Sequence, residues 1–198
     1  MAVTDVQIIN MALSHLGHTI FIDDRNENST EAEVSNLHYD QAIAYVLEDF
    51  AWGLAHRYHT LELVEEDPSE DWQFSYRYPV DTVKIRRLVT ALGRRDPAPP
   101  PFVIGSDDAG RLIYTDQEDA VASTTAHITD TALFTAQFAE AVSWWLAGLM
   151  APGLSKDPQV AGGCFQMYAW LVQRAAAHDG NESQVPPEED SEAIRARA

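Results

Sequence analysis

Residues 72–81 read Trp72-Gln-Phe-Ser-Tyr-Arg-Tyr-Pro79-Val-Asp81 and carry the clearest strand signal of the chain. Aromatic residues stand at every second position, at Trp72, Phe74, Tyr76 and Tyr78. Alternate side chains of a strand share one face, so the spacing predicts a strand with an aromatic face. Proline lacks the N–H that a central strand must donate, and Pro79 is therefore expected to end it.

An aromatic face can stack nucleic-acid bases, pack a sheet or contact another subunit. Base-stacking sheets need a basic groove, whereas the acidic residues Asp67, Glu70 and Asp71 precede this strand. We therefore expect the four rings to serve in sheet packing or in a subunit interface.

Helical patterns lie on both sides of this strand. Thr4-Asp-Val-Gln7 is a capping box, and Gly17 supplies a left-handed stop, which predicts a helix over about 4–17. Thr30-Glu-Ala-Glu33 is read as a second capping box, opening a helix over about 30–53. Further helices are predicted at about 131–151 and 157–179, the last starting at Asp157-Pro158.

Short strands and turns are expected between about 61 and 115, including a hairpin built from 102–104 and 111–114. The predicted fold is α+β and mainly α: a four-helix bundle with a small antiparallel sheet or hairpin inserted between its second and third helices. Residues 1–180 would form one domain. Residues 181–198 are polar and charged, which predicts a flexible, extended C-terminal tail.

Composition restricts the function. The chain has 198 residues and a formal net charge of −18, from 31 acidic and 13 basic side chains. Wrapping nucleic-acid phosphates requires clustered Lys and Arg, so that class is disfavoured. Residues 132–151 read as a buried helix and not as a membrane span, and no signal peptide is apparent, so we expect a soluble protein made in the cytosol.

The sequence offers only weak candidates for a metal-binding or catalytic site. Asp24 to Asn28 resembles the start of an EF-hand loop, but serines at 29 and 35 replace the required glycine and glutamate. Two histidine pairs, His15/His18 and His56/His59, lack further convergent ligands. Cys164 is expected to pack as a small apolar residue. We therefore expect no enzyme, metal or cofactor, with a small hydrolase that uses Cys164 or a histidine pair as the remote alternative.

Trp144-Trp145 lies within the third predicted helix. Adjacent helical residues point about 100° apart, so both rings cannot face one narrow stripe. Trp145 fits the apolar stripe, which leaves Trp144 near its edge. Trp144 is therefore either an interface anchor for a partner or part of a wide core.

Taken in order, several of these segments resemble one family. Ala12-Leu-Ser-His-Leu-Gly17, Ala51-Trp52-Gly-Leu-Ala55, Trp72–Asp81 and Arg111-Leu-Ile-Tyr-Thr-Asp116 are similar to successive elements of the tail tubular protein A family. These proteins are the head-to-tail adaptors of short-tailed bacteriophages, and the resemblance covers residues 4 to 180.

The resemblance implies a structural virion protein of the phage neck, assembled in the host cytoplasm and not in a membrane. It implies a dodecameric ring between the portal protein and the tail nozzle, which is a tail tubular protein B-like component. Genomic DNA would pass through the lumen without specific binding. Another head-completion or tail-terminator connector is the alternative within this class.

The resemblance also implies a C-terminal segment that docks on the portal. In this chain the segment is short and acidic, but it ends with apolar and cationic side chains. We expect its portal contact at Ile194, Arg195 and Arg197.

Overall fold

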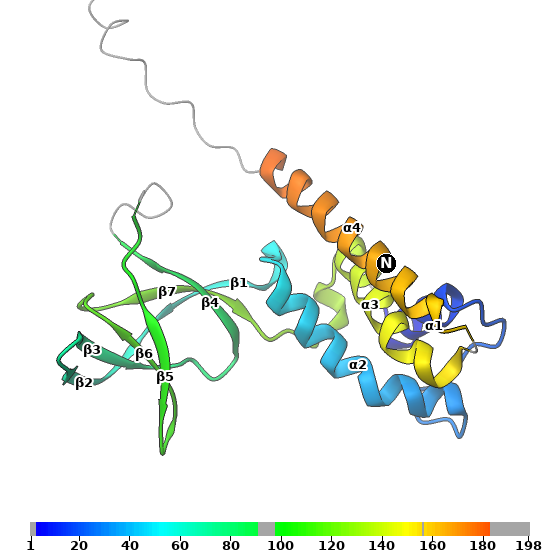
Figure 1. The fold of residues 1–198 in the computed structure, drawn as a ribbon, viewed down its shortest axis with the longest axis horizontal. Helices are drawn as coiled ribbons and strands as arrows, with labels where there is room; N and C mark the ends of the chain where they lie inside the picture. Colours follow the sequence, from blue (N-terminus) through cyan, green and yellow to red (C-terminus); the bar gives the residue numbers. More distant parts are fainter. Residues whose placement is uncertain (1–2, 91–97, 156, 183–198) are drawn as a thin grey trace, which may run out of the picture.

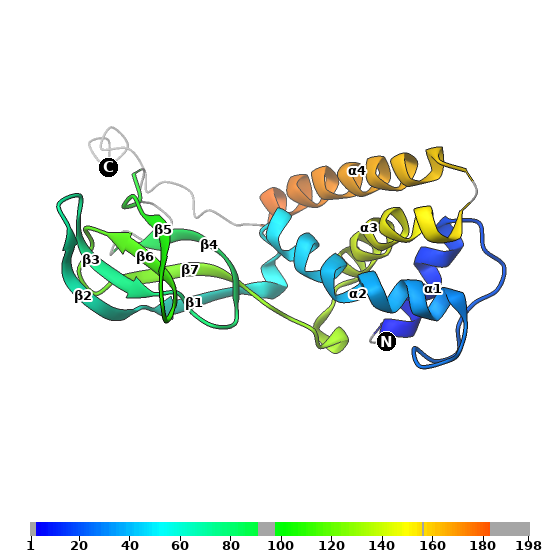
Figure 2. The same cartoon turned by 60° about the horizontal axis from the view of Figure 1, so that its bottom comes forward.

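The structure is a computed structural model, and it describes residues 3–90, 98–155 and 157–182. It has two parts that lie side by side, a helical part and a β part (Figure 1). The chain enters the β part once, after the second helix, and returns once, before the third (Figure 2).

The helical part contains α1 (Asp5–His15), α2 (Thr30–Asp49), α3 (Ala136–Leu154) and α4 (Gln159–Glu182), with short 3₁₀ turns η1 (Gly53–Ala55) and η3 (Thr131–Leu133). The β part contains β1 (His56–Thr60), β2 (Glu62–Ser69), β3 (Trp72–Arg77), β4 (Thr82–Val89), β5 (Val103–Asp107), β6 (Gly110–Thr115) and β7 (Val121–Ala126).

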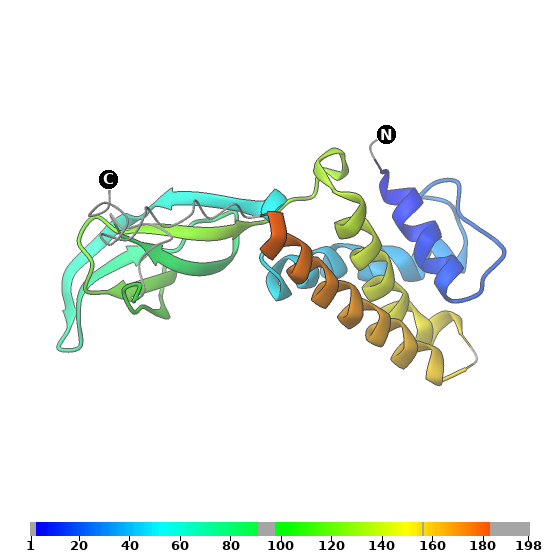
Figure 3. The same ribbon diagram turned by 90° about the horizontal axis from the view of Figure 1, so that it is seen from above.

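Helix α3 is the centre of the helical part, because it packs against α1, α2 and α4 (Figure 3). Its buried residues therefore surround much of the helix and are not confined to one stripe. Phe138 and Val142 are buried as the periodicity predicts, but Leu133 lies in η3 and is 52% exposed. Leu146 is buried more completely than its neighbour Trp145.

The ends of α1 follow the local sequence. Thr4 and Gln7 form the predicted capping box. At the other end Gly17 has φ +79°, His18 N donates to Leu13 O, and Gly17 N donates to Ser14 O. This pair of hydrogen bonds satisfies carbonyls of the last turn, so the predicted glycine stop is confirmed.

The ends of α2 differ from the prediction. Ser29, and not Thr30, is the N-cap, since its hydroxyl accepts from Ala32 N. The helix ends at Asp49, about four residues earlier than expected. Trp52 is part of the reason: its indole folds back beneath the last turn and donates to Val46 O at 2.8 Å.

The last two helices also depart from their predicted limits. The third helix was predicted to end at about residue 151, just before Pro152, but α3 continues through this proline to Leu154. A proline removes one hydrogen bond from the ladder, and this loss is small in a final turn that is about to end. Asp157 acts at the start of α4, where its carboxylate accepts from Gln159 N at 2.8 Å.

The contact between α3 and α4 depends on Gly148. A Cβ at this position would overlap the Phe165 ring of α4, with the ring Cζ only 2.7 Å away. Phe165 is held in place by Trp145, whose ring centroid lies 4.6 Å from its own. The two helices therefore approach closely because residue 148 has no side chain.

Gly148→Leu is expected to lower the free energy of unfolding by about 1–3 kcal/mol, because it overpacks this contact. Gly162→Ala is the matched control: it lies in α4 and has nothing within 4 Å of an added Cβ. That change should raise stability by about 0.5–1 kcal/mol through helix propensity. Urea unfolding of both variants measures the difference, and equal effects would contradict this account of the packing.

The β part consists of two antiparallel sheets. One has three strands in the order β1-β7-β4, and the other has four in the order β2-β3-β6-β5. Leu61 stands between β1 and β2, where the chain passes from one sheet to the other, and its N–H donates to Ala120 O. The β part has its own cluster of buried side chains: Leu61, Tyr76, Tyr78, Ile85, Leu88, Ile113, Ala120 and Ala122.

The prediction of a helical bundle with a small hairpin insertion is therefore wrong. Strands extend from His56 to Ala126 and form two sheets with a core of their own. The hairpin of β5 and β6 was predicted, but β1 and β7 were not. Residues 56–60 and 121–126 lie outside the predicted strand region of about 61–115, and Val121–Ala126 is mostly Ala, Ser and Thr, which gives little periodic signal. β7 is a strand because it pairs with β1 and β4 on its two sides.

Arg86 of β4 joins the two parts. Its guanidinium donates to Leu47 O at 2.8 Å and to Phe50 O at 2.9 Å, at the end of α2. It also donates to Thr125 Oγ1 of β7 at 2.7 Å. Lys84 of the same strand donates to Glu48 O at 3.3 Å. The last carbonyls of α2 are thus satisfied by the β part, which suits the negative end of a helix dipole.

Candidate partner-binding surfaces

The aromatic strand β3 packs mainly inside the β part. Tyr76 and Tyr78 are buried, and their hydroxyls donate to Gln117 O and Val83 O. Phe74 is partly buried against the same cluster, and Trp72 is partly exposed. The two tyrosine rings are therefore not available to stack on bases.

Trp144 lies at the edge of the helical core. Its ring stacks on His15 of α1, with centroids 3.6 Å apart and the planes inclined by 7°. His15 Nε2 lies 3.1 Å from the hydroxyl of Ser143. Trp144 thus joins α3 to α1, and this contact leaves only part of its surface for a partner.

His15 makes stability depend on pH. Burial lowers the pKa of His15 from 6.5 to about 4. Between about pH 6.5 and pH 4, His15 binds a proton in the unfolded chain but stays neutral in the folded chain. The free energy of unfolding therefore decreases as the pH falls from about 6.5 to 4. Allowing for solvent screening of the half-buried ring, the expected loss is about 1–2 kcal/mol.

His15→Phe tests this, because it keeps a ring on Trp144 but cannot titrate. Denaturant unfolding at pH 7 and pH 4 should show a smaller loss of stability in the variant than in the wild type. Since carboxyl groups in general also begin to bind protons as the pH falls toward 4, the difference between the two proteins is the quantity to compare. Parallel losses would contradict a role for His15.

Trp170 on α4 is a partner-binding candidate that the sequence analysis did not single out. It is 50% exposed, and Met167, one turn earlier, is 39% exposed. Arg174 lies over the Trp170 ring, 5.2 Å from its centroid. The face is exposed because, among the described elements, α4 packs mainly on α3 with its opposite side (Figure 3). Its position outside the apolar stripe of Cys164, Leu171 and Ala175 was the available signal.

A shallow apolar groove runs beside α1. It has a volume of about 500 Å³, and its lining residues are Val3, Gln7, Asn10, Met11, Ser14, His15 and Phe21. Phe21 is 49% exposed and Ile20, next to it, is 70% exposed. The groove is therefore a second apolar surface on the helical part.

The candidates for chemistry are spread over the molecule. Cys164 is 2% exposed, and burial raises the pKa of its thiol, which disfavours the reactive thiolate. His18 Nδ1 lies 3.7 Å from Glu31 Oε1, and His56 Nε2 lies 2.9 Å from Ser123 Oγ. Among residues 3–90, 98–155 and 157–182, no group of three or more His, Cys, Asp or Glu side chains is arranged to hold a metal ion.

The segment that resembles an EF-hand start forms a local turn. Asp24 accepts from Asn26 N at 2.7 Å, and Arg25 Nε donates to Asn36 of α2. These contacts tie the segment to the start of α2. The predicted tail contacts Ile194, Arg195 and Arg197 lie outside the described residues.

No protein-family model matches this chain. A search of curated proteins also finds no match. Within the part of the chain that the structure describes, no helix has the length and apolar character needed to cross a membrane.

Proposed function

We propose that this protein is a structural virion protein, a head-to-tail adaptor of a short-tailed bacteriophage. It forms a ring, dodecameric by the resemblance, that joins the portal protein to the tail nozzle. The ring surrounds the channel through which the genome leaves, and DNA passes without specific binding. Its place is the neck of the virion, after assembly in the host cytoplasm.

The proposal is supported by the positions, in the fold, of the segments that resemble the tail tubular protein A family. Ala12–Gly17 is the end of α1, and Ala51–Ala55 is the passage from α2 to β1. Trp72–Asp81 is β3 and the turn after it, and Arg111–Asp116 covers most of β6. The resembling segments thus include both a helix end beside the β part and two paired strands within it.

The helical part offers the surface we assign to the portal. Trp170 and Met167 form an exposed apolar face on α4, and exposed tryptophans are common anchors of protein interfaces. The net charge of −18 suits a channel protein that must not hold DNA, because like charges repel.

The test is to mix the protein with the portal protein of the same phage and to measure mass by native mass spectrometry. We expect a ring of this chain on the portal ring, visible in negative-stain images. If neither the free protein nor the mixture gives a large complex, the proposal fails. Trp170→Ala should weaken the complex while leaving the protein folded.

Residues 181–198 are the proposed portal-docking segment, with Ile194, Arg195 and Arg197 as its contacts. Deleting this segment should weaken docking more than it weakens folding. Unchanged docking of the truncated protein would remove the segment from the proposal and leave the adaptor role intact.

A further inference from the structure

Two surfaces of the β part are complementary in charge. The first is β2, the edge strand of the four-stranded sheet, whose residues 62–67 are all exposed. It carries the acidic side chains Glu62, Glu65, Glu66 and Asp67. Between them lie Leu63 and Val64, which are 46% and 43% exposed. We call residues 62–67 the acidic strand.

The second surface is the outer face of the three-stranded sheet. Directly paired residues of an antiparallel sheet point to the same side. Ser123 of β7 pairs with Tyr58 of β1 on one side and with Arg87 of β4 on the other. Two residues farther along β7, Thr125 pairs with His56 and with Lys84 in the same way. We call His56, Tyr58, Lys84 and Arg87 the basic face.

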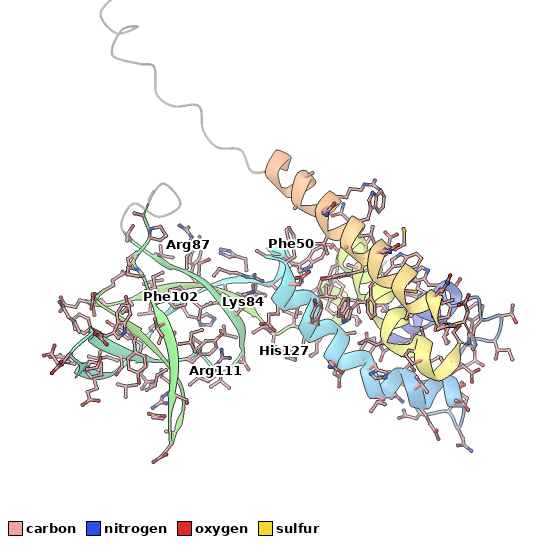
Figure 4. The ribbon with its side chains drawn as sticks, viewed as in Figure 1. Phe50, Lys84, Arg87, Phe102, Arg111 and His127 are labelled. Carbon is pink, nitrogen blue, oxygen red and sulfur yellow. The ribbon has the colours of Figure 1, made fainter. Side chains whose placement is uncertain are left out.

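The basic face points away from the core of the β part. Ile85, Leu88 and Ala122, which occupy the alternate rows, belong to that core. On the opposite side Tyr58 is 56% exposed, and the His56 ring meets it edge-on at 4.7 Å. Lys84 and Arg87 both come from β4: Lys84 lies beside the helical part, where its ammonium also donates to Glu48 O, and Arg87 lies farther along the strand (Figure 4).

The chemistry of the two surfaces matches. An exposed tyrosine beside cationic side chains is a typical centre for a protein interface, in which Tyr and Arg are enriched. The acidic strand offers leucine and valine for the ring and carboxylates for the cations. A nucleic acid is the other possible occupant of a basic face, but a chain of net charge −18 repels it at longer range.

We infer that the basic face of one copy of this chain binds the acidic strand of a second copy. The two surfaces belong to different sheets, so each copy offers one of each kind and the contact is head-to-tail. Such a contact closes into a ring when the rotation between copies permits. The inference rests on the proposed ring and assigns the residues that build it.

We expect side chains to hold this contact, and not backbone hydrogen bonds between β2 and a strand of the second copy. β2 carries Pro68 and two irregularities in its pairing with β3, and Asp67 has φ +50°. Proline, bulges and charged residues on an edge strand oppose backbone pairing with another sheet. Electrostatic attraction across the interface should therefore govern both its rate of formation and its salt dependence.

Charge exchange tests the inference. Variant one is Glu65→Lys with Glu66→Lys, variant two is Lys84→Glu with Arg87→Glu, and variant three combines all four changes. Variants one and two should each weaken self-association at least about 100-fold, because each sets like charges against each other. Variant three reverses both surfaces and should restore association to within about tenfold of the wild type.

The matched control is Glu33→Lys with Asp40→Lys, which changes net charge as variant one does but on exposed positions of α2. It should assemble like the wild type. Tyr58→Ser removes the ring without a change of charge and should weaken assembly. Mass photometry of the full chain, alone and with portal, at low and high salt gives the size of the assembly. Circular dichroism shows whether each variant is folded, and the radius of gyration of the single copy shows whether variant two keeps the junction in which Lys84 donates to Glu48 O.

The outcomes separate the two proposals. Rings that form equally in the wild type, variant one and variant two would overturn this inference and leave the adaptor role standing. Assembly that stops at two copies would overturn the head-to-tail contact. Binding of duplex or single-stranded DNA by the wild type, lost in variant two, would reassign the basic face to nucleic acid. No assembly of the wild type under any condition would overturn the adaptor proposal and this inference together.

Discussion

Trp52→Ala is expected to lower the free energy of unfolding by about 3–5 kcal/mol, the usual cost of removing a buried tryptophan. Trp52 is 5% exposed and lies where the helical part meets the chain that enters β1. Its ring meets Phe50 and Phe138 edge-on, at 5.0 and 5.2 Å between centroids. Its N–H also satisfies Val46 O, so alanine leaves both a cavity and an unpaired carbonyl.

Two variants give this prediction its controls. Trp170→Ala removes the same side chain from an exposed position and should change stability by no more than about 0.5 kcal/mol. Trp52→Phe keeps much of the packing but not the donor, and should cost about 1–3 kcal/mol. Denaturant unfolding followed by far-ultraviolet circular dichroism measures all three. Equal costs for Trp52→Ala and Trp170→Ala would mean that Trp52 does not hold the end of α2.

Arg86→Met is expected to lower the free energy of unfolding by about 2–4 kcal/mol, since hydrogen bonds from a charged donor contribute about 1.5–3 kcal/mol each and solvent reaches part of the group. Methionine keeps a long side chain but loses all three hydrogen bonds of the guanidinium. Leu47 O and Phe50 O would both lose this donor. Burial lowers the pKa of Arg86, and the carboxylates of Glu48 and Asp49 oppose that effect.

The same variant should loosen the two parts relative to each other. Arg86 connects β4 and β7 to the end of α2, so its loss should raise the radius of gyration measured by small-angle X-ray scattering. Arg174→Met is the control, because Arg174 lies exposed on α4 and its guanidinium lies over the Trp170 ring. Scattering and unfolding that match the wild type in both variants would show that the junction does not depend on Arg86.

The features that could be predicted from the sequence depend on interactions between residues close together in the chain. The capping box of Thr4 and Gln7 and the stop at Gly17 involve residues within a few positions of each other, and both are confirmed. The alternating rings of β3 predicted that strand for the same reason. Ser29 was missed as a cap because two adjacent residues, Ser29 and Thr30, both have a suitable hydroxyl. The hydrogen bond to Ala32 N decides between them.

Partner surfaces were harder to predict, since exposure depends on what covers each helix. The sequence left Trp144 open between an interface anchor and part of a wide core; its ring stacks on His15 of a different helix and stays partly exposed. Trp170, whose one signal in the sequence was its position outside the apolar stripe of its helix, is the more exposed ring. Leu37 fits the apolar pattern of α2 but is 72% exposed, because none of the elements that the structure describes covers it.

Four helices, most of their start and stop signals, the aromatic strand β3 and the acidic character of the chain could all be predicted from the amino-acid sequence. These properties follow from neighbouring residues or from composition. The sheet of β1, β4 and β7 could not be predicted in this way, since the pairs His56 with Thr125 and Thr125 with Lys84 join residues distant in sequence. The tertiary structure also placed α3 at the centre and set the basic face and the acidic strand on different sheets. Side chains far apart in sequence create these features only when backbone pairing and apolar burial bring them together.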